Sequence, residues 1–221
     1  MARMPRLVVP GYPHHVTQRG NRRQRTFFND SDYRYYIELI AESAHHTETE
    51  VWAYCLMPNH VHLVMVPSTE DGLRATLGEA HRHYTRHINF RHKWRGHLWQ
   101  ERFHSYVMNE EHLLATVRYV ERNPVSARLC QHPAEWPWSS AQAHLQGADD
   151  DRVTVKPMLE RISDWETYLA NTDPIDNLES IRLHNRTGRP LGCNAFIKTL
   201  EQKTGKTLAP KRPGPKPHST N

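Results

Sequence analysis

Two spacings of hydrophobic residues alternate along the first part of this 221-residue chain. Short apolar runs with the character of strands occupy residues 13–19, 51–57, 60–66 and 103–108. Elsewhere, apolar side chains recur at three- or four-residue intervals, which predicts helices over residues 33–44, 73–88 and 109–123. The elements follow one another as strand, helix, strand, strand, helix, strand, helix. This order predicts an α+β fold in which helices pack on an antiparallel sheet.

The pattern weakens after about residue 129, and residues 156–203 are expected to form short helices. Residues 210–217 are rich in proline and basic side chains, so they suit neither a helix nor a central strand. We therefore expect a core domain over residues 1–130, a C-terminal helical extension over 131–205 and a disordered basic tail over 206–221. The sequence contains no internal repeat.

The third expected strand, residues 60–66, is the most informative run, because it is apolar apart from His60 and His62. Side chains alternate along a strand, so both imidazoles point to one face and Val61 points to the other. The two rings could be inert structural groups, each satisfied by a hydrogen bond. Burying both polar rings on one apolar strand is costly without a shared purpose, so a metal site is the favoured interpretation.

The helix expected over residues 109–123 carries a second set of polar groups. Leu113, Val117 and Val120 form its core-facing stripe, whereas Tyr119 and Asn123 are neighbours on a different side. A tyrosine on a helix is most often a packing residue. If this side of the helix meets the histidine pair, however, two imidazoles and the amide oxygen of Asn123 could hold one divalent cation. Such a ligand set suits Mg²⁺ or Mn²⁺ better than zinc, and Tyr119 would lie where it could attack a phosphodiester.

The charge of the chain makes a polyanionic partner plausible. The formal net charge is +5 and the isoelectric point is about 9.2, a modest excess of base. The helix over residues 73–88 is mostly basic outside its apolar stripe, and a stretch with cations and tryptophans follows it. Because bases stack on tryptophan while cations hold phosphate, we expect a surface for single-stranded DNA. The candidate DNA-binding residues are Arg19, Arg22, Arg23, Arg82, Arg86, Lys93, Trp94, Arg95, Lys211 and Arg212.

Cysteine usage and the absence of long apolar runs indicate a cytoplasmic protein. Cys55, Cys130 and Cys193 are odd in number and far apart, which argues against a disulfide framework and against a thiolate zinc site. The first residues lead into no apolar segment of signal-peptide type, and no run is long enough to span a membrane. For a DNA-binding protein, we expect association with the nucleoid.

Four segments resemble the HUH single-tyrosine transposases, and in particular the branch of REP-associated tyrosine transposases. These segments are residues 10–20, 56–63, 119–124 and 136–140, and the resemblance is strong over residues 5–145. It implies a ferredoxin-like sheet with packed helices. It also implies that His60, His62 and Asn123 are metal ligands, with Asn123 where insertion-sequence relatives often carry glutamine, and that Tyr119 is the nucleophile.

The activity that the resemblance implies is cleavage and rejoining of single-stranded DNA beside palindromic hairpins, through a 5′-phosphotyrosine intermediate. Members of the family act as monomers or as homodimers. A relaxase or replication initiator of the same chemistry is disfavoured, because its tyrosine usually precedes the histidine pair. A non-catalytic protein that binds DNA hairpins is a rival from another class. A hydrolytic zinc enzyme is the weakest alternative, because no third histidine or suitable carboxylate is evident.

Overall fold

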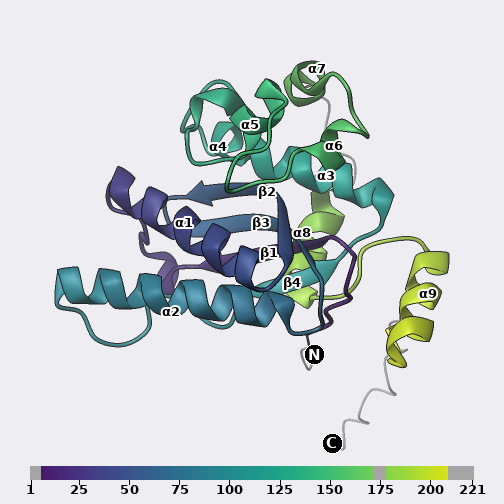
Figure 1. The fold of residues 1–221 in the computed structure, drawn as a ribbon, viewed down its shortest axis with the longest axis horizontal. Coiled ribbons are helices and arrows are strands. Elements are labelled where there is room, and N and C mark those ends of the chain that lie inside the picture. Colours follow the sequence, from purple (N-terminus) through teal and green to yellow (C-terminus); the bar gives the residue numbers. More distant parts are fainter. Residues whose placement is uncertain (1–5, 172–177, 209–221) are drawn as a thin grey trace, which may run out of the picture.

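A computed structural model describes residues 6–171 and 178–208, and its centre is a four-stranded antiparallel sheet (Figure 1). The strands are arranged in the order β2-β3-β1-β4. This arrangement confirms the predicted α+β class and the ferredoxin-like sheet with packed helices. The elements of the core are β1 (His14–Arg19), α1 (Asp30–His46), β2 (Thr49–Met57), β3 (His60–Pro67), α2 (Gly72–His92), β4 (His104–Val107) and α3 (Glu110–Glu121).

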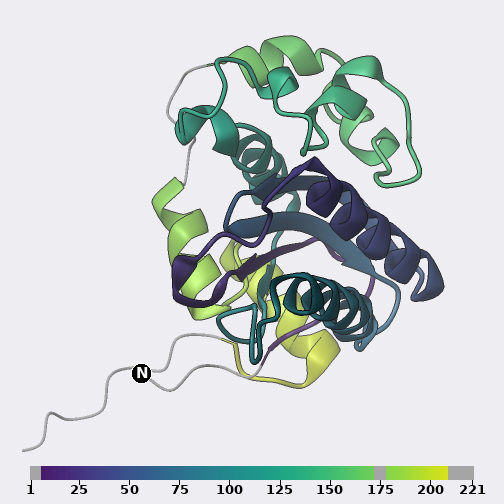
Figure 2. The ribbon, with the colours of Figure 1, turned by 90° about the vertical axis from the view of Figure 1, so that its left-hand side faces the viewer.

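Helices cover both faces of the sheet, so the central strands are buried on both sides. Figure 2 shows α1 and α2 on one side, and α3 on the other with α8 (Leu178–Thr187). Because side chains alternate along each strand, the apolar residues of the sheet belong to two separate hydrophobic cores. Val61 packs with residues of α1 and α2, whereas Val64 packs with residues of α3. The direct pairing of Thr17 with His62 and of Arg19 with His60 places these four side chains on the α3 side.

The third helix ends earlier than its sequence predicts. α3 stops at Glu121, and Asn123 begins a separate short helix, α4 (Asn123–Ser126), rather than lying in the last turn of α3. The cause is Pro124, which has no backbone N–H and whose ring would clash with a preceding carbonyl inside a continuous helix. Asn123 therefore follows a break in the helix, yet its side chain still reaches the strand that carries the histidines.

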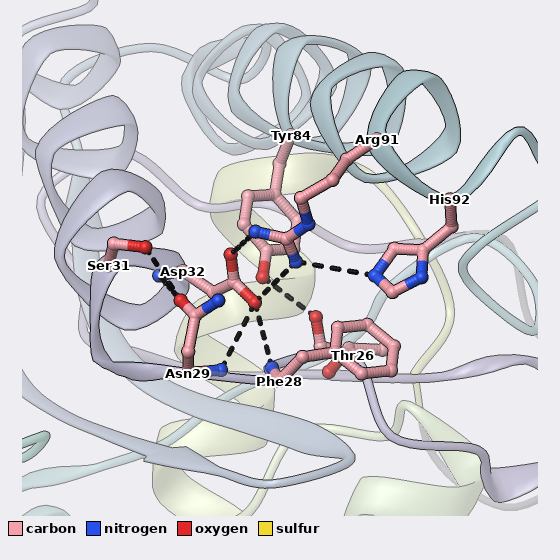
Figure 3. A network of polar contacts seen from close by, with 8 residues as sticks. All are labelled: Thr26, Phe28, Asn29, Ser31, Asp32, Tyr84, Arg91 and His92. Atoms are coloured by element: carbon pink, nitrogen blue, oxygen red, sulfur yellow. Dashed lines mark hydrogen bonds and ion pairs between the residues drawn. The ribbon is translucent and has the colours of Figure 1, made fainter.

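An ion pair between the buried Asp32 and the partly exposed Arg91 joins the start of α1 to the end of α2 (Figure 3). The carboxylate of Asp32 accepts two hydrogen bonds from Arg91, at 2.6 and 2.7 Å, and also accepts from the backbone N–H groups of Phe28 and Asn29. Asn29 in turn caps α1 in a capping box with Asp32. This network fixes the two helices that support the far side of the sheet.

The residues after α4 pack against the core. They form α5 (Ala141–Gln146), α6 (Lys156–Leu159), α7 (Trp165–Ala170), α8 and α9 (Asn194–Thr204), as expected for a helical extension. Trp136 donates a hydrogen bond from Nε1 to the carbonyl of Leu56 on β2, and Trp165 and Leu169 enter the core beneath α3. The boundary at residue 130 stays a prediction. No helix among the described residues is long and apolar enough to cross a membrane.

Candidate metal and nucleophile site

The two histidines of β3 lie side by side at one end of the sheet. His62 is buried and His60 is half-buried, and their ring centroids are 5.0 Å apart. Nδ1 of His60 lies 2.6 Å from Oδ1 of Asn59, and Nδ1 of His62 lies 3.0 Å from Nε2 of His15. Because Nδ1 is engaged in both rings, Nε2 is the nitrogen that each ring can offer to a ligand.

Burial keeps these imidazoles in the form that binds metal. Burial, assisted by the nearby charge of Arg19, lowers the pKa of His60 to about 4. Burial also lowers the pKa of His15 to about 3 and holds the pKa of His62 well below its usual range. Both ligand candidates are therefore neutral near pH 7, and a neutral imidazole is the form that coordinates a cation.

Tyr119 and Asn123 meet the histidine pair from the α3 side. The ring of Tyr119 lies edge-on to His62 with centroids 5.5 Å apart, and Nδ2 of Asn123 is 3.5 Å from Nε2 of His62. A metal at Nε2 of His62 would require the amide of Asn123 to rotate and present Oδ1. The structure thus brings together the four residues that the sequence predicts as ligands and nucleophile, and their roles stay predictions.

The donor set can hold a divalent cation and leaves coordination positions open. Within residues 6–171 and 178–208, no group of three His, Cys, Asp or Glu side chains could hold a metal. The candidate metal ligands at this site are therefore the two imidazoles of His60 and His62 and the amide oxygen of Asn123. Such a set leaves sites for phosphate oxygens, as Mg²⁺ and Mn²⁺ sites for phosphoryl chemistry do.

A cleft of about 480 Å³ opens beside the histidines and is lined by arginine side chains from two parts of the chain. Arg19 and Arg23 come from the end of β1 and the turn after it, whereas Arg182 and Arg186 come from α8. Burial, together with the charge of Arg23, lowers the pKa of Arg19. Cations crowded around one cleft make it a suitable place for a phosphate backbone.

Sequence reasoning missed the contributions of α8 and of His15. Thr17 of β1 donates a hydrogen bond to Oδ1 of Asn185 at 2.7 Å, which holds α8 over the cleft. His15 was visible only as one residue of a predicted strand. Its alternation with Thr17 and Arg19 was the available signal that it shares their face.

The other predicted DNA-binding residues that the structure describes do not line this cleft. Arg82 and Arg86 are exposed on α2, and Lys93, Trp94 and Arg95 follow that helix, so they lie on the side of the sheet opposite Tyr119. Arg82 pairs with Glu79 at 2.6 Å, which offsets part of its charge. Arg22 is exposed in the turn after β1, and Lys211 and Arg212 lie outside the described residues. The role of this set stays a prediction.

The structure brings one tyrosine and a His-x-His pair together on a ferredoxin-like sheet, and this combination can be compared with known families. The family model described as "Transposase IS200 like" matches residues 9–123, which is more than half of the chain. The chain therefore belongs to the IS200-like transposase family. The resemblance to single-tyrosine transposases seen in the sequence is thereby confirmed.

Individual relatives carry the name of the REP-associated branch. A Haemophilus influenzae protein described as a candidate REP-associated tyrosine transposase is 27% identical over 110 residues, which cover 45% of this chain and 62% of the relative. The chain thus spans less than two thirds of that relative. A solved structure of a REP-associated tyrosine transposase bound to a REP hairpin matches with a TM-score of 0.58 and 20% identity, covering 70% of this chain and 92% of its own. This second likeness establishes the shared fold.

Proposed function

We propose that this chain cleaves and rejoins single-stranded DNA beside palindromic hairpins, with Tyr119 as the nucleophile. The observation that carries the proposal is the approach of Tyr119 and Asn123 to the buried histidine pair at one end of an arginine-lined cleft. The named relatives, one of them bound to a REP hairpin, support the hairpin as the element beside which cleavage takes place.

The reaction is a transesterification at phosphorus. A bond forms between the phenolic oxygen of Tyr119 and the phosphorus atom, the phenolic proton is lost, and the bond from phosphorus to the 3′ oxygen breaks. The 3′ oxygen takes up a proton, and the 5′ phosphate stays on the tyrosine. Attack by the 3′ hydroxyl of another strand reverses these steps, so rejoining needs no ATP.

The residues around Tyr119 would bind the metal, stabilise negative charge and position the DNA strand. Nε2 of His60, Nε2 of His62 and Oδ1 of Asn123 would hold Mg²⁺ or Mn²⁺, which supplies Lewis-acid assistance at the phosphate. Arg19 lines the same cleft and its charge interacts with Tyr119, so its cation is placed to favour the negative charge of the phosphate. Arg182 and Arg186 position the backbone of the strand in the cleft.

A denaturing-gel assay of the covalent adduct tests the proposal. Labelled single-stranded hairpins from the DNA that flanks the gene are incubated with protein and either Mn²⁺ or EDTA. We expect a shifted band that requires Mn²⁺, is absent in Tyr119→Phe and persists in Tyr35→Phe, a matched control on α1 at the other face of the sheet.

Two results would contradict the proposal. An adduct of normal yield in Tyr119→Phe would assign the nucleophile to another residue. Tight binding of the hairpin with no adduct from the wild-type protein would favour a non-catalytic hairpin-binding protein instead.

A further inference from the structure

A second cavity, of about 530 Å³, lies on the α2 side of the sheet and has no part in the proposed chemistry. Its apolar walls come from Leu77 of α2 and from Leu98, Trp99 and Phe103, which precede β4. Gln18 also lines it. This mixture of aromatic walls and a few polar groups is typical of a site for a small planar ligand.

Two residues that line the cavity each have a buried polar side-chain atom with no hydrogen-bond partner among the described residues: Oε1 of Gln18 and Nε1 of Trp99. Their residues are only 3% and 8% exposed. The amide nitrogen of Gln18 donates to the carbonyl of Glu101 at 2.8 Å, so the amide orientation is set and its oxygen is left over. An unpaired acceptor and an unpaired donor are unfavourable when buried, and a ligand that carries both groups would complement them.

The charges around the cavity identify the class of ligand. Arg6, Arg74 and Arg102 line it, and the guanidinium of Arg6 lies 3.5 Å from the centroid of the Phe103 ring. Arg74 is paired with Asp71 and Glu101 also lines the cavity, so part of this charge is offset, and the remaining cations beside an aromatic wall suit a ring attached to phosphate. A nucleobase fits this description, because each base has donors and acceptors on one edge and a face that stacks on aromatic side chains.

The position of the cavity connects it with the cleft that holds the histidine pair. Gln18, Gln100 and Glu101 line both spaces, so the two share a wall. A strand that binds with one phosphate beside His60 and His62 and then passes this shared wall would bring a neighbouring nucleotide to the cavity. We infer that the cavity receives one nucleobase of the single-stranded DNA next to the phosphate that Tyr119 attacks, an inference that rests on the proposed function.

Gly78 offers a way to block the cavity without disturbing the fold. It lies on the exposed surface of α2 and lines the cavity, and a Cβ atom added to it meets no atom within 4 Å. Gly78→Phe therefore introduces a ring at the cavity, and Gly78→Ala is the matched control that leaves it open. Alanine is also the better helix former, so the control should melt no lower than the wild type.

The experiment combines these variants with an abasic scan of the unpaired nucleotides beside the hairpin. Binding is measured by fluorescence anisotropy in EDTA, so that cleavage plays no part. For the wild type and Gly78→Ala, we expect one position at which removal of the base weakens binding about 5- to 100-fold, the range for loss of one stacked base. Gly78→Phe should bind intact DNA more weakly by a similar factor and lose the sensitivity at that position.

A second variant tests the donor itself. Trp99→Phe keeps an aromatic ring and removes Nε1, so we expect a weaker preference among the four bases at the sensitive position, with Oε1 of Gln18 left as the discriminating group. A wild-type protein that binds the hairpin tightly but shows no sensitive position would overturn the inference. So would a folded Gly78→Phe variant with an unchanged abasic profile. Failure of the wild type to bind hairpin DNA at all would instead contradict the proposed function.

Discussion

Replacement of His15 tests whether the protein prepares His62 to bind a metal. Nε2 of His15 faces Nδ1 of His62 at 3.0 Å, and Nδ1 of His15 faces the hydroxyl oxygen of Tyr106 at 3.1 Å. Only one proton can lie between the two imidazoles. When Nδ1 of His62 carries it, Nε2 of His62 keeps a lone pair for a cation; when His15 carries it, neutral His62 has its proton on Nε2 and cannot coordinate.

The expected loss follows from removing the acceptor. In His15→Leu, the buried Nδ1–H group of His62 has no partner, so the proton moves to Nε2 or stays unpaired at a cost of about 1–3 kcal/mol. Partners of this kind typically contribute 10- to 100-fold to metal affinity, or about 1.4–2.7 kcal/mol. His15→Gln can place an amide oxygen near the position of Nε2, so it should restore most of the affinity.

Titration calorimetry with Mn²⁺ measures the affinity directly and needs no DNA. We expect weaker binding by about 10- to 100-fold in His15→Leu, and recovery in His15→Gln. His14→Gln is the matched control, because His14 is equally buried on the same strand but bonds to the backbone of Val9 and Tyr12. It should alter stability without altering affinity. A folded His15→Leu variant with wild-type Mn²⁺ affinity would refute the reasoning.

Three other perturbations have defined outcomes. Burial raises the pKa of Asp32, but the hydrogen bonds from Arg91 and from the backbone lower it by more than burial raises it. The pKa of Asp32 is therefore below its ordinary value. The contribution of Asp32 to the free energy of unfolding is complete above its ordinary pKa near 4 and is lost as the pH falls through the lowered pKa of the folded state. In Asp32→Asn, the free energy of unfolding from urea titrations should therefore depend less on pH in this acidic range. Glu121→Gln should lower the unfolding free energy by about 1–3 kcal/mol, measured in the same titrations, because an amide N–H₂ then faces buried donors. Alanine at both Arg182 and Arg186 should reduce the salt slope of single-stranded DNA binding by about 1.4, if each holds one phosphate, and an unchanged slope would remove them from the DNA path.

Local periodicity was sufficient to predict the core of the fold. The apolar run in residues 60–66 and the apolar stripes of α1, α2 and α3 depend only on near neighbours along the chain. The ferredoxin-like sheet was implied by the family resemblance and not by periodicity, and the structure confirms it with the strand order β2-β3-β1-β4 and with helices on both faces. The end of α3 was predicted two residues too late, because the apolar stripe continues through Val120 while Pro124 acts on the backbone before it.

Some residues of the candidate site could likewise be predicted from local sequence patterns, and others could not. His60, His62 and Tyr119 stand out because each departs from the pattern of its own element. His15 and Arg182 do not, because a strand histidine and a helix arginine are ordinary until tertiary contacts bring them to the same cleft. Their contribution depends on the pairing of β1 with β3 and on the docking of α8 on β1, which join residues far apart in the sequence.

Glu121 connects the helix that carries Tyr119 to the residues after α4. It lies two positions after Tyr119, fully buried, and points away from the histidines. Its carboxyl group is bonded by the hydroxyl of Ser140, by Nδ1 of His144 at 2.6 Å and by Nε1 of Trp165 at 2.9 Å. All three partners come from the extension. The helix that carries the nucleophile is thus held on one side by the sheet and on the other by the extension, so a change in either would move Tyr119 relative to the histidine pair.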